Sequence, residues 1–372
     1  MNVPRPAWAD IDLAAIRRNV SRVAAGLTPN TKVMAVVKAN AYGHGDVEVA
    51  RAALEAGASW CGVILVDEAL RLRAGGVEAP ILLLHEPPAE RMEEALRNDL
   101  TPVVFTRKGI EAVSDAAAKL GRSAAVHLKL DTGLNRLGCP PDQLVDIATA
   151  LSKESHVEVH GLMTHFAFAD EPANPVIDAQ LERFADMCER LRALGIEPQM
   201  RHVGNSAAAI TRPDAHFDMI RLGIAMYGLS PGPQVDGHVE LQPAMQLKAR
   251  IAQVKRCRAG DAVSYGHRYR LEHDGTIVSI PLGYADGWPR ALTNNAHVLI
   301  GGKRYPAVGT VTMDSFLADI GNDTCEIGDE VVLIGTQGEE RITADEVAAR
   351  LGTINYEVVT RISTRIPRVF HG

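Results

Sequence analysis

The chain has 372 residues, of which 46% are hydrophobic, and this length and composition are typical of two folded domains with sizeable cores. Its formal net charge is -7, and its lysines and arginines are scattered, which excludes a basic face for nucleic acid. No apolar run reaches the ~18 residues of a membrane helix, and residues 1–8 lack a charged-then-apolar secretory pattern. We therefore expect a cytoplasmic protein without a membrane or nucleic-acid partner.

The cysteines argue against disulfide or metal chemistry. There are 5 of them, widely spaced and without a Cys-x-x-Cys pair. We expect reduced core residues and no metal site.

Helix-period segments alternate with short apolar strands from about residue 12 to residue 228, which is the pattern of parallel α/β folds. The eight expected strands are 32–38, 59–64, 80–84, 101–105, 124–130, 157–163, 199–203 and 217–220. Amphipathic stretches between them include 47–56, 107–119 and 180–194, each followed by a glycine suited to a helix C-terminus. Eight strand–helix units in about 215 residues favour a TIM-type (β/α)8 barrel, with an open doubly wound sheet as the alternative.

After residue 243 the pattern changes to short alternating runs at 247–254, 276–281, 304–308 and 330–334, separated by Gly, Asp and Asn turns. One helix is expected at 343–351, with Thr343 as its N-cap and Gly352 after its end. We therefore expect three segments: an N-terminal strand within 1–11 that packs with the C-terminal domain, a barrel over 12–242, and a mostly β domain over 243–372.

A lysine ends the first expected strand, in the sequence Val-Val-Lys-Ala-Asn-Ala-Tyr-Gly-His-Gly over residues 36–45. The apolar run before Lys38 is typical of a strand buried on both faces, and the glycines after it indicate a loop. A desolvated lysine is costly unless its charge is paired or lost, and a Schiff base to an aldehyde cofactor such as pyridoxal phosphate (PLP) removes it. The alternative is a lysine that extends to solvent at the rim of the sheet.

More polar residues follow the later strands, so a barrel would gather them at one face. The strand 124–130 contains Lys129 and leads into a loop with Asp131 and Arg136, and these charges suit a substrate carboxylate or, alternatively, an ion-pair network. His165 follows the next strand, where a packed histidine is the commoner case.

The loops after the seventh and eighth strands are candidates for a phosphate site. The turn 204–206, Gly-Asn-Ser, precedes an expected helix, and Arg221 and Gly223 follow the eighth strand. Phosphate sites of barrels usually lie in these two loops, although a plain helix cap is the alternative for the turn.

The decapeptide around Lys38 resembles, residue for residue, the PLP-attachment signature of alanine racemases. The resemblance covers essentially the whole chain in motif order, from Trp8 to the final residues. It implies a PLP-dependent isomerase that interconverts L-alanine and D-alanine and supplies D-alanine for peptidoglycan.

Inversion at Cα needs proton donors on opposite faces of the cofactor, and one lysine serves only one face. The resemblance implies that Lys38 handles the proton on the D side and Tyr265, in Val263-Ser264-Tyr265-Gly266-His267, handles it on the L side. Read alone, Tyr265 is a strand tyrosine before a glycine. A phenol titrates near pH ~10 in water, so such a base needs a cationic or hydrogen-bonded setting, which His165 and Arg221 would supply.

The resemblance also implies the roles of the other site residues. Arg136 would contact the phenolic oxygen of the cofactor and the substrate carboxylate, and Lys129 matches a position that is often carbamylated. His165 would lie beside the pyridine ring. Most relatives carry Met where this chain has Leu134, which is a mild change. Residues implied to bind the cofactor or its phosphate are Tyr42, Asn205, Ser206, Arg221, Gly223, Ile224 and Tyr356.

Two residues are implied on the substrate side: Met313, whose backbone N–H would hold the substrate carboxylate, and Tyr284 at the entrance. Read alone, the segments 283–287, 309–314 and 355–357 are each a turn or a strand edge. In the family two subunits pair head to tail, which implies a homodimer whose sites borrow Tyr265 and Met313 from the partner.

Arg221 is implied to contact the pyridine nitrogen, where many PLP enzymes use an acidic partner. An arginine only donates hydrogen bonds, so it leaves that nitrogen unprotonated and the ring a weaker electron sink. This suits a racemase, which must return the proton and avoid transamination or decarboxylation.

Three alternatives remain. A broad-specificity racemase of the same fold usually carries a secretory signal, which is not seen here. A PLP-binding homeostasis protein consists of the barrel alone, whereas this chain has residues 243–372. PLP-dependent decarboxylases generally pair the pyridine nitrogen with a carboxylate where this chain has Arg221.

Overall fold

The computed structural model describes residues 5–372, which form two compact units. The barrel unit consists of Ala15–Ala41 and Asp46–Gln242. The β unit consists of the described residues up to Ala14, of Tyr42–Gly45, and of Pro243–Gly372. The first four residues of the N-terminal segment expected at 1–11 lie outside the described range.

The barrel unit contains eight parallel strands in the order β8-β7-β6-β5-β4-β3-β2-β9. They are β2 (Lys32–Val36), β3 (Trp60–Val63), β4 (Ile81–Leu83), β5 (Leu100–Val104), β6 (Ala124–Lys129), β7 (Val157–Met163), β8 (Met200–His202) and β9 (Met219–Leu222). Asp218 N–H donates to Arg201 O and Arg221 N–H donates to Gly204 O, which links β9 to β8. The eight strands therefore form a nearly closed barrel, and the open doubly wound alternative is wrong.

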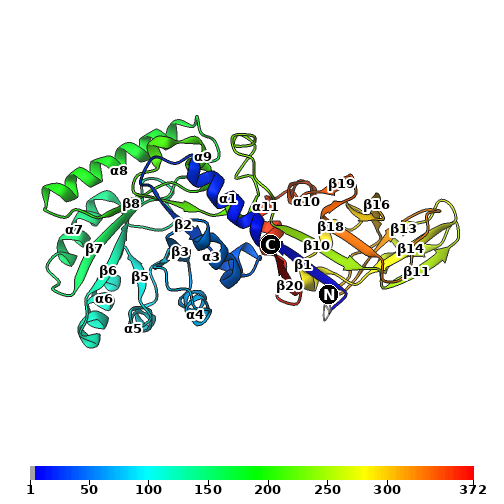
Figure 1. Cartoon of the computed structure of the whole chain (residues 1–372), viewed down its shortest axis with the longest axis horizontal. Helices are drawn as coiled ribbons and strands as arrows, with labels where there is room; N and C mark the ends of the chain where they lie inside the picture. The colour runs from blue at the N-terminus through cyan, green and yellow to red at the C-terminus, as the bar shows by residue number, and fades with distance from the viewer. Residues whose placement is uncertain (1–4) are drawn as a thin grey trace. The chain divides into compact units, whose positions relative to one another are not determined.

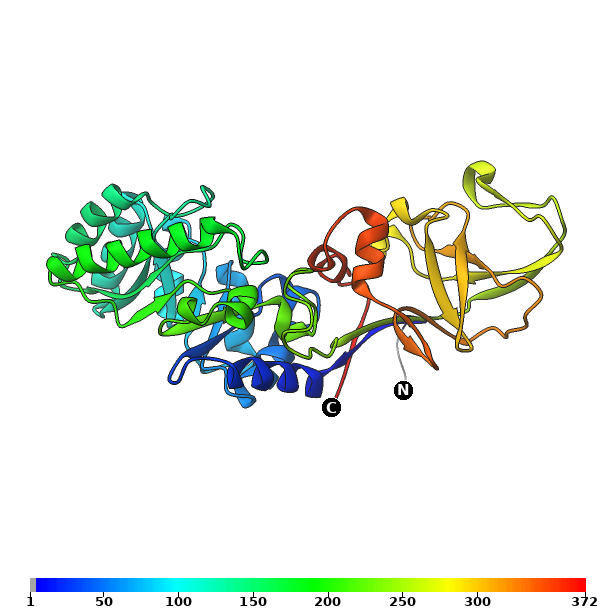
Figure 2. The same ribbon diagram turned by 90° about the horizontal axis from the view of Figure 1, so that it is seen from above.

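Helices surround the strands, as Figures 1 and 2 show for α4 to α8. The helical elements are α1 (Leu13–Ala25), α2 (Lys38–Tyr42, a left-handed turn), α3 (Asp46–Glu55), α4 (Val66–Ala74), α5 (Ala89–Arg97), α6 (Arg107–Leu120), α7 (Pro141–Leu151), α8 (Pro175–Ala193), α9 (Ser206–Thr211), η1 (Pro213–Ala215) and η2 (Ile224–Tyr227). Because helices cover the outside and side chains fill the inside, β3 and β4 are buried at every position.

The sequence predicted all eight barrel strands to within two residues at each end. It placed the start of α8 five residues late, at 180 instead of Pro175. The side chain of Asn174 accepts a hydrogen bond from Val176 N–H, and a proline follows this N-cap, so Asn-Pro was the start signal that the prediction missed.

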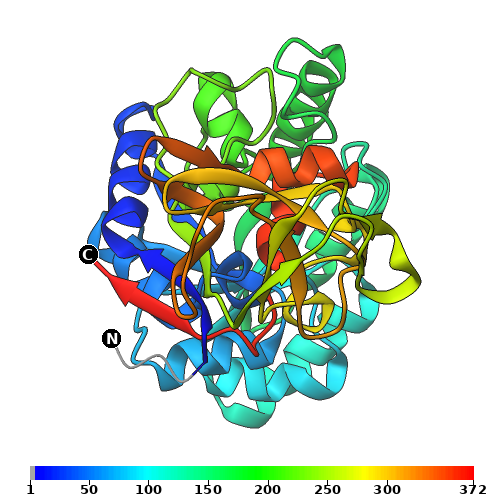
Figure 3. The ribbon, with the colours of Figure 1, turned by 90° about the vertical axis from the view of Figure 1, so that its right-hand side faces the viewer.

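The β unit is built on a ten-stranded sheet with the order β11-β14-β17-β16-β15-β18-β10-β1-β20, in which β19 also pairs with β18. In Figure 3 the first strand, β1 in blue, lies beside the last, β20 in red, and the two are parallel. A separate ribbon joins β12 and β13.

The strands of this unit are β1 (Ala7–Asp12), β10 (Met245–Arg250), β11 (Gln253–Cys257), β12 (Ala262–Val263), β13 (Tyr269–Arg270), β14 (Gly275–Ile280), β15 (Ala296–Ile300), β16 (Lys303–Val308), β17 (Phe316–Asp319), β18 (Glu330–Gln337), β19 (Glu340–Ile342) and β20 (Arg368–His371). Its helical elements are η3 (Tyr265–His267), η4 (Tyr284–Asp286), η5 (Arg290–Leu292), α10 (Ala344–Leu351) and α11 (Asn355–Thr360).

Three predictions for this unit need correction. The run expected at 247–254 is two strands, because Ile251 N–H donates to Asp329 O while Ala252 N–H donates to Ser279 O, so the pairing partner changes there. The segment 355–357, expected as a turn or strand edge, begins the helix α11. Tyr265, read alone as a strand residue, begins the turn η3. The helix at 343–351 is confirmed, with Thr343 capping it and Gly352 in the left-handed conformation.

Gly43 holds the segment 42–45 against the C-terminal part of the β unit. Its φ is 85°, and a Cβ built on it would lie 2.3 Å from Val359 O. The Arg368 guanidinium donates to Gly43 O over 2.8 Å. Only glycine therefore combines this backbone conformation with this close approach.

We predict that Gly43→Ala destabilises the protein more than Gly57→Ala. Both glycines have positive φ, but nothing lies within 4 Å of a Cβ on Gly57. Gly57→Ala should cost about 1 kcal/mol from backbone strain, and Gly43→Ala roughly 1–3 kcal/mol more from the clash with Val359. Urea unfolding of both variants measures the difference, and equal losses would contradict the packing of Gly43.

Candidate active site

The site residues predicted from the barrel sequence lie at the carboxyl ends of its strands or in the loops that follow them, where barrel enzymes carry their active sites. These residues are Lys38 after β2, Lys129 at the end of β6, Arg136 in the loop that follows, His165 after β7, Asn205 and Ser206 after β8, Arg221 in β9, and Gly223 and Ile224 after it.

Arg221 is the most buried charge of this group, with 4% of its surface exposed. Its Nη1 donates to His202 O over 2.8 Å and contacts His202 Nδ1 at 3.1 Å. Its Nη2 donates to Thr164 O and Val203 O and contacts His165 Nδ1 at 3.0 Å. Burial lowers the pKa of Arg221 to about 10. Burial and then Arg221 hold the pKa of His165 well below its usual range, so His165 is a neutral ring that accepts from the guanidinium.

Burial and the arginines Arg221 and Arg136 also lower the pKa values of the two lysines of the site. Burial lowers the pKa of Lys38, as do Arg136 and Arg221, while the Glu68 carboxylate opposes them. Burial lowers the pKa of Lys129 to about 8, with Arg221 and Arg136 adding to the effect. A lowered pKa leaves more of the lysine amine uncharged at a given pH, and the uncharged amine is the nucleophile that attacks a carbonyl.

The turn after Lys38 is strained. Ala39, Asn40, Ala41 and Tyr42 have φ values of 52, 56, 51 and 53°. The left-handed conformation costs roughly 1–2 kcal/mol for each non-glycine residue, so neighbouring groups must stabilise it.

Glu68 provides one such group. Its carboxylate is buried and accepts hydrogen bonds from Ala39 N–H (2.6 Å), Ile64 N–H (2.9 Å) and Leu65 N–H (3.1 Å). It therefore fixes the backbone next to Lys38 and places a negative charge near the amine. The sequence analysis missed Glu68, because a glutamate in the first turn of a helix has no distinctive pattern.

Ser206 joins the two loops that were expected to form a phosphate site. Its Oγ accepts from Gly223 N–H over 2.8 Å and lies 3.4 Å from Ala225 N. Asn205 caps α9 by accepting from Ala208 N–H, so its side chain has the helix-cap role that the sequence left as an alternative. The loops after β8 and β9 thus meet at the serine hydroxyl.

The β unit carries the four tyrosines predicted for the site, which are Tyr42, Tyr265, Tyr284 and Tyr356. Tyr42 and Tyr356 lie with their ring centroids 6.2 Å apart at an interplanar angle of 45°. Burial raises the pKa of Tyr42 to about 12, so this phenol stays neutral and is able to donate a hydrogen bond.

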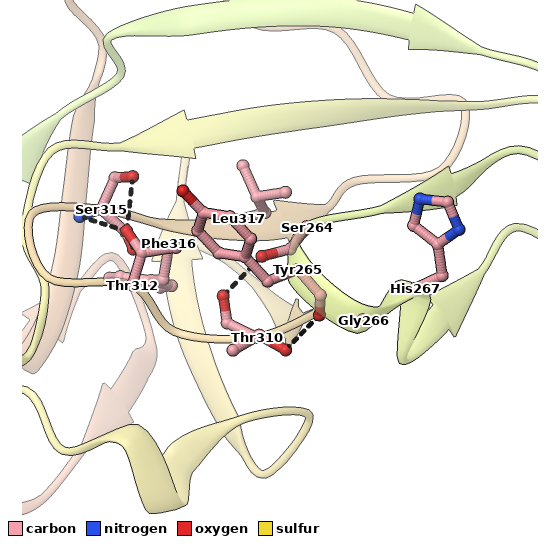
Figure 4. A pocket seen from close by; sticks show the side chains of 9 residues that line it. All are labelled: Ser264, Tyr265, Gly266, His267, Thr310, Thr312, Ser315, Phe316 and Leu317. Atoms are coloured by element: carbon pink, nitrogen blue, oxygen red, sulfur yellow. Dashed lines mark hydrogen bonds between the residues drawn. The ribbon is translucent and has the colours of Figure 1, made fainter.

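Tyr265 lies in a turn that is held by two side-chain hydrogen bonds, as Figure 4 shows. Thr310 Oγ1 donates to Tyr265 O over 2.7 Å, and Ser264 Oγ donates to Thr310 O over 2.6 Å. The Tyr265 side chain is 75% exposed, while His267 points away from it.

Tyr284 and Met313 are brought together by backbone pairing. Tyr284 N–H donates to Thr312 O and Ala285 N–H donates to Met313 O, each over 3.0 Å. The side chains of Tyr284 and Met313 are 42% and 52% exposed. Tyr265, Tyr284 and Met313 are thus three large exposed residues of one unit.

Over residues 5–372 no helix is long and apolar enough to cross a membrane. Within that range no group of three or more His, Cys, Asp or Glu side chains is arranged to hold a metal ion.

A parallel barrel with a lysine of lowered pKa and a buried arginine at its strand ends, joined to a strand-rich unit bearing exposed tyrosines, defines a barrel-type PLP enzyme. Residues 11–231 match the family model "Alanine racemase, N-terminal domain", and residues 244–370 match "Alanine racemase, C-terminal domain". The chain belongs to the alanine racemase family.

Individual relatives agree over the full length. An alanine racemase of Symbiobacterium thermophilum is 46% identical over 369 residues, covering 99% of this chain and 98% of the relative. The structure of an alanine racemase from Streptomyces lavendulae has a TM-score of 0.95 at 43% identity, covering 100% and 98%. A histidine racemase from Leuconostoc mesenteroides has a TM-score of 0.91 at 31% identity, covering 100% of both chains.

We predict that Glu68→Gln lowers the free energy of unfolding by about 1–3 kcal/mol, because the amide would turn a donor toward backbone N–H groups. Loss of the negative charge should also lower the pKa of Lys38 further. Glu55→Gln is the matched control, since the Glu55 side chain is 64% exposed in its contact with Arg17. Urea unfolding and the pH dependence of Lys38 methylation measure the two effects, and a Glu68→Gln protein as stable as the control would refute the role.

Proposed function

We propose that this chain racemises alanine with PLP, using Lys38 and Tyr265 as its two bases, and so supplies D-alanine for peptidoglycan. The observation that carries the proposal is Lys38 itself: a strand-end lysine whose pKa is lowered by burial and by neighbouring arginines. Membership of the alanine racemase family supports the substrate.

The residues present fit PLP. The Lys38 amine suits the aldehyde, and Arg221 suits an unprotonated ring nitrogen because a guanidinium only donates. The loops joined at Ser206 suit the phosphate, with Asn205, Gly223, Ile224, Tyr42 and Tyr356 as further proposed contacts. When bound, the cofactor supplies an electron sink for the negative charge that develops at Cα.

The side chains of the protein would transfer the protons and orient the substrate. Lys38 would hold or return the Cα proton on the D side and Tyr265 on the L side. Arg136, the backbone N–H of Met313 and the entrance residue Tyr284 would orient the substrate carboxylate. His165, which accepts from Arg221 as a neutral ring, would set the hydrogen-bonding environment of the second base.

Histidine is the second candidate substrate, because a histidine racemase shares this fold at 31% identity. Proton NMR of each alanine and histidine enantiomer in D₂O distinguishes the two. We expect deuteration at Cα and racemisation of both alanine enantiomers, with histidine much slower. Faster exchange of histidine would overturn the choice of substrate.

We also propose that the active form is a cytoplasmic homodimer with shared sites. Tyr265, Met313 and Tyr284 are large and exposed in the single chain, and covering them by a second copy would remove apolar surface from water. The 5 cysteines are all free, as expected in a reducing compartment.

We predict a CO₂ adduct on Lys129. The amine is surrounded by Arg221, Arg136 and Lys38, and a carbamate there would give these cations an anion to bind. Carbamates form from the neutral amine, so with a pKa of about 8 the adduct should decline as the pH falls below 8. Carbon-13 NMR in labelled bicarbonate measures it.

The matching variant is Lys129→Ala, which should be inactive and partly rescued by acetate or chloride. Lys153→Ala, at an exposed lysine, is the control and should behave as the parent. A fully active Lys129→Ala would refute the role.

We predict that two inactive variants complement each other. After dissociation and reassociation, a mixture of Lys38→Ala and Tyr265→Ala subunits should regain activity, because one site in each heterodimer then has both residues. Each variant treated alone is the control. If the mixture stays inactive while mass spectrometry confirms heterodimers, the shared-site proposal is wrong.

A further inference from the structure

Three histidines continue the hydrogen bonding of Arg221 into the interior of the barrel. Arg221 Nη1 lies 3.1 Å from His202 Nδ1. His202 Nε2 lies 2.8 Å from His127 Nδ1, and His127 Nε2 lies 3.1 Å from His160 Nδ1. The four residues come from β9, β8, β6 and β7, so the contacts link four neighbouring strands of the barrel.

A glycine and an irregular strand register make room for these rings inside the barrel. A Cβ on Gly161 would lie 2.5 Å from the His127 ring, so only glycine leaves room for it. The register between β6 and β7 shifts between Val126 and His127. Trp60 stacks on His160, with centroids 5.9 Å apart at 26°, and lies 5.6 Å from His127. His127 and His202 are fully buried, and His160 is half-buried.

Arg221 determines which nitrogen donates and which accepts in each hydrogen bond between the three histidines. A guanidinium has donors only, so His202 Nδ1 must accept and the His202 proton lies on Nε2. By the same reasoning His127 accepts at Nδ1 and donates from Nε2, and His160 accepts at Nδ1. Burial lowers the pKa of His127 to about 3 and holds that of His202 well below its usual range, so both rings remain neutral. One tautomer of each ring satisfies every contact.

We propose that His202, His127 and His160 are positioning residues that orient the Arg221 guanidinium from inside the barrel. The hydrogen bonds to His202, Thr164, His165 and Val203 use the terminal nitrogens. Among residues 5–372 no hydrogen bond from Arg221 Nε–H is found, so this donor is open to a ligand. The histidine series fixes the plane of the guanidinium and thereby the direction of that donor. Its effect on catalysis rests on the proposed function, in which Arg221 faces the ring nitrogen.

The direct test is nitrogen-15 NMR of histidine-labelled protein, with and without PLP. We expect His202, His127 and His160 to be neutral Nε2–H tautomers near neutral pH in both forms. Arg221→Met should remove this fixed direction, and His202 and His127 should then show mixed tautomers. Nδ1–H at His127 or His202 in the parent protein would overturn the proposal, whatever the substrate proves to be.

The second test compares His160→Leu with His160→Asn. Leucine removes the acceptor for His127, whereas the asparagine oxygen replaces Nδ1. We expect His160→Leu to shift the His202 nitrogen resonances and lower kcat roughly fivefold, the effect of one neutral hydrogen bond, with KM unchanged. His160→Asn should restore both. If both variants lose activity in proportion to stability and leave the His202 resonances unmoved, the series is only structural and the proposal fails.

Discussion

The buried guanidinium of Arg221 is the constraint on which the candidate site depends. A charge removed from water is costly unless its donors find partners, and the two terminal nitrogens of Arg221 have three backbone carbonyls and two histidine rings as partners. Those partners come from the ends of β7 and β8, so satisfying one side chain fixes the spacing of three neighbouring strands. Arg221 also lowers the pKa of Lys38, Lys129, His165 and His202.

The result is a site of positive charge and neutral bases. Glu68 is a carboxylate near Lys38, but its oxygens are occupied by three backbone N–H groups. Such a site favours an anionic ligand that also carries a carbonyl, because arginines bind an anion and a lysine of lowered pKa is the nucleophile for a carbonyl. The strained turn after Lys38 also depends on its surroundings, since four left-handed residues in succession persist only where neighbouring groups fix them.

The sequence was sufficient for the barrel because hydrophobic periodicity records burial directly: Lys32–Val36 is apolar after its first residue and is a buried strand. Roles such as that of Tyr265 came only from the resemblance, since a tyrosine before a glycine is ambiguous by itself. The turn 39–42 could not be predicted, because Ala and Tyr disfavour positive φ. The histidine series escaped detection because His127, His160 and His202 meet only after three strands have paired.

The central claim is that Lys38 is the amine to which the cofactor bonds, in the setting that Arg221 organises. Borohydride reduction of the PLP-loaded enzyme followed by peptide mapping tests it most directly, because reduction makes that bond permanent. The account predicts a single labelled peptide that contains Lys38. A label on Lys129, which is buried and also has a lowered pKa, or on any other lysine would contradict the assignment and the arrangement of strands behind it.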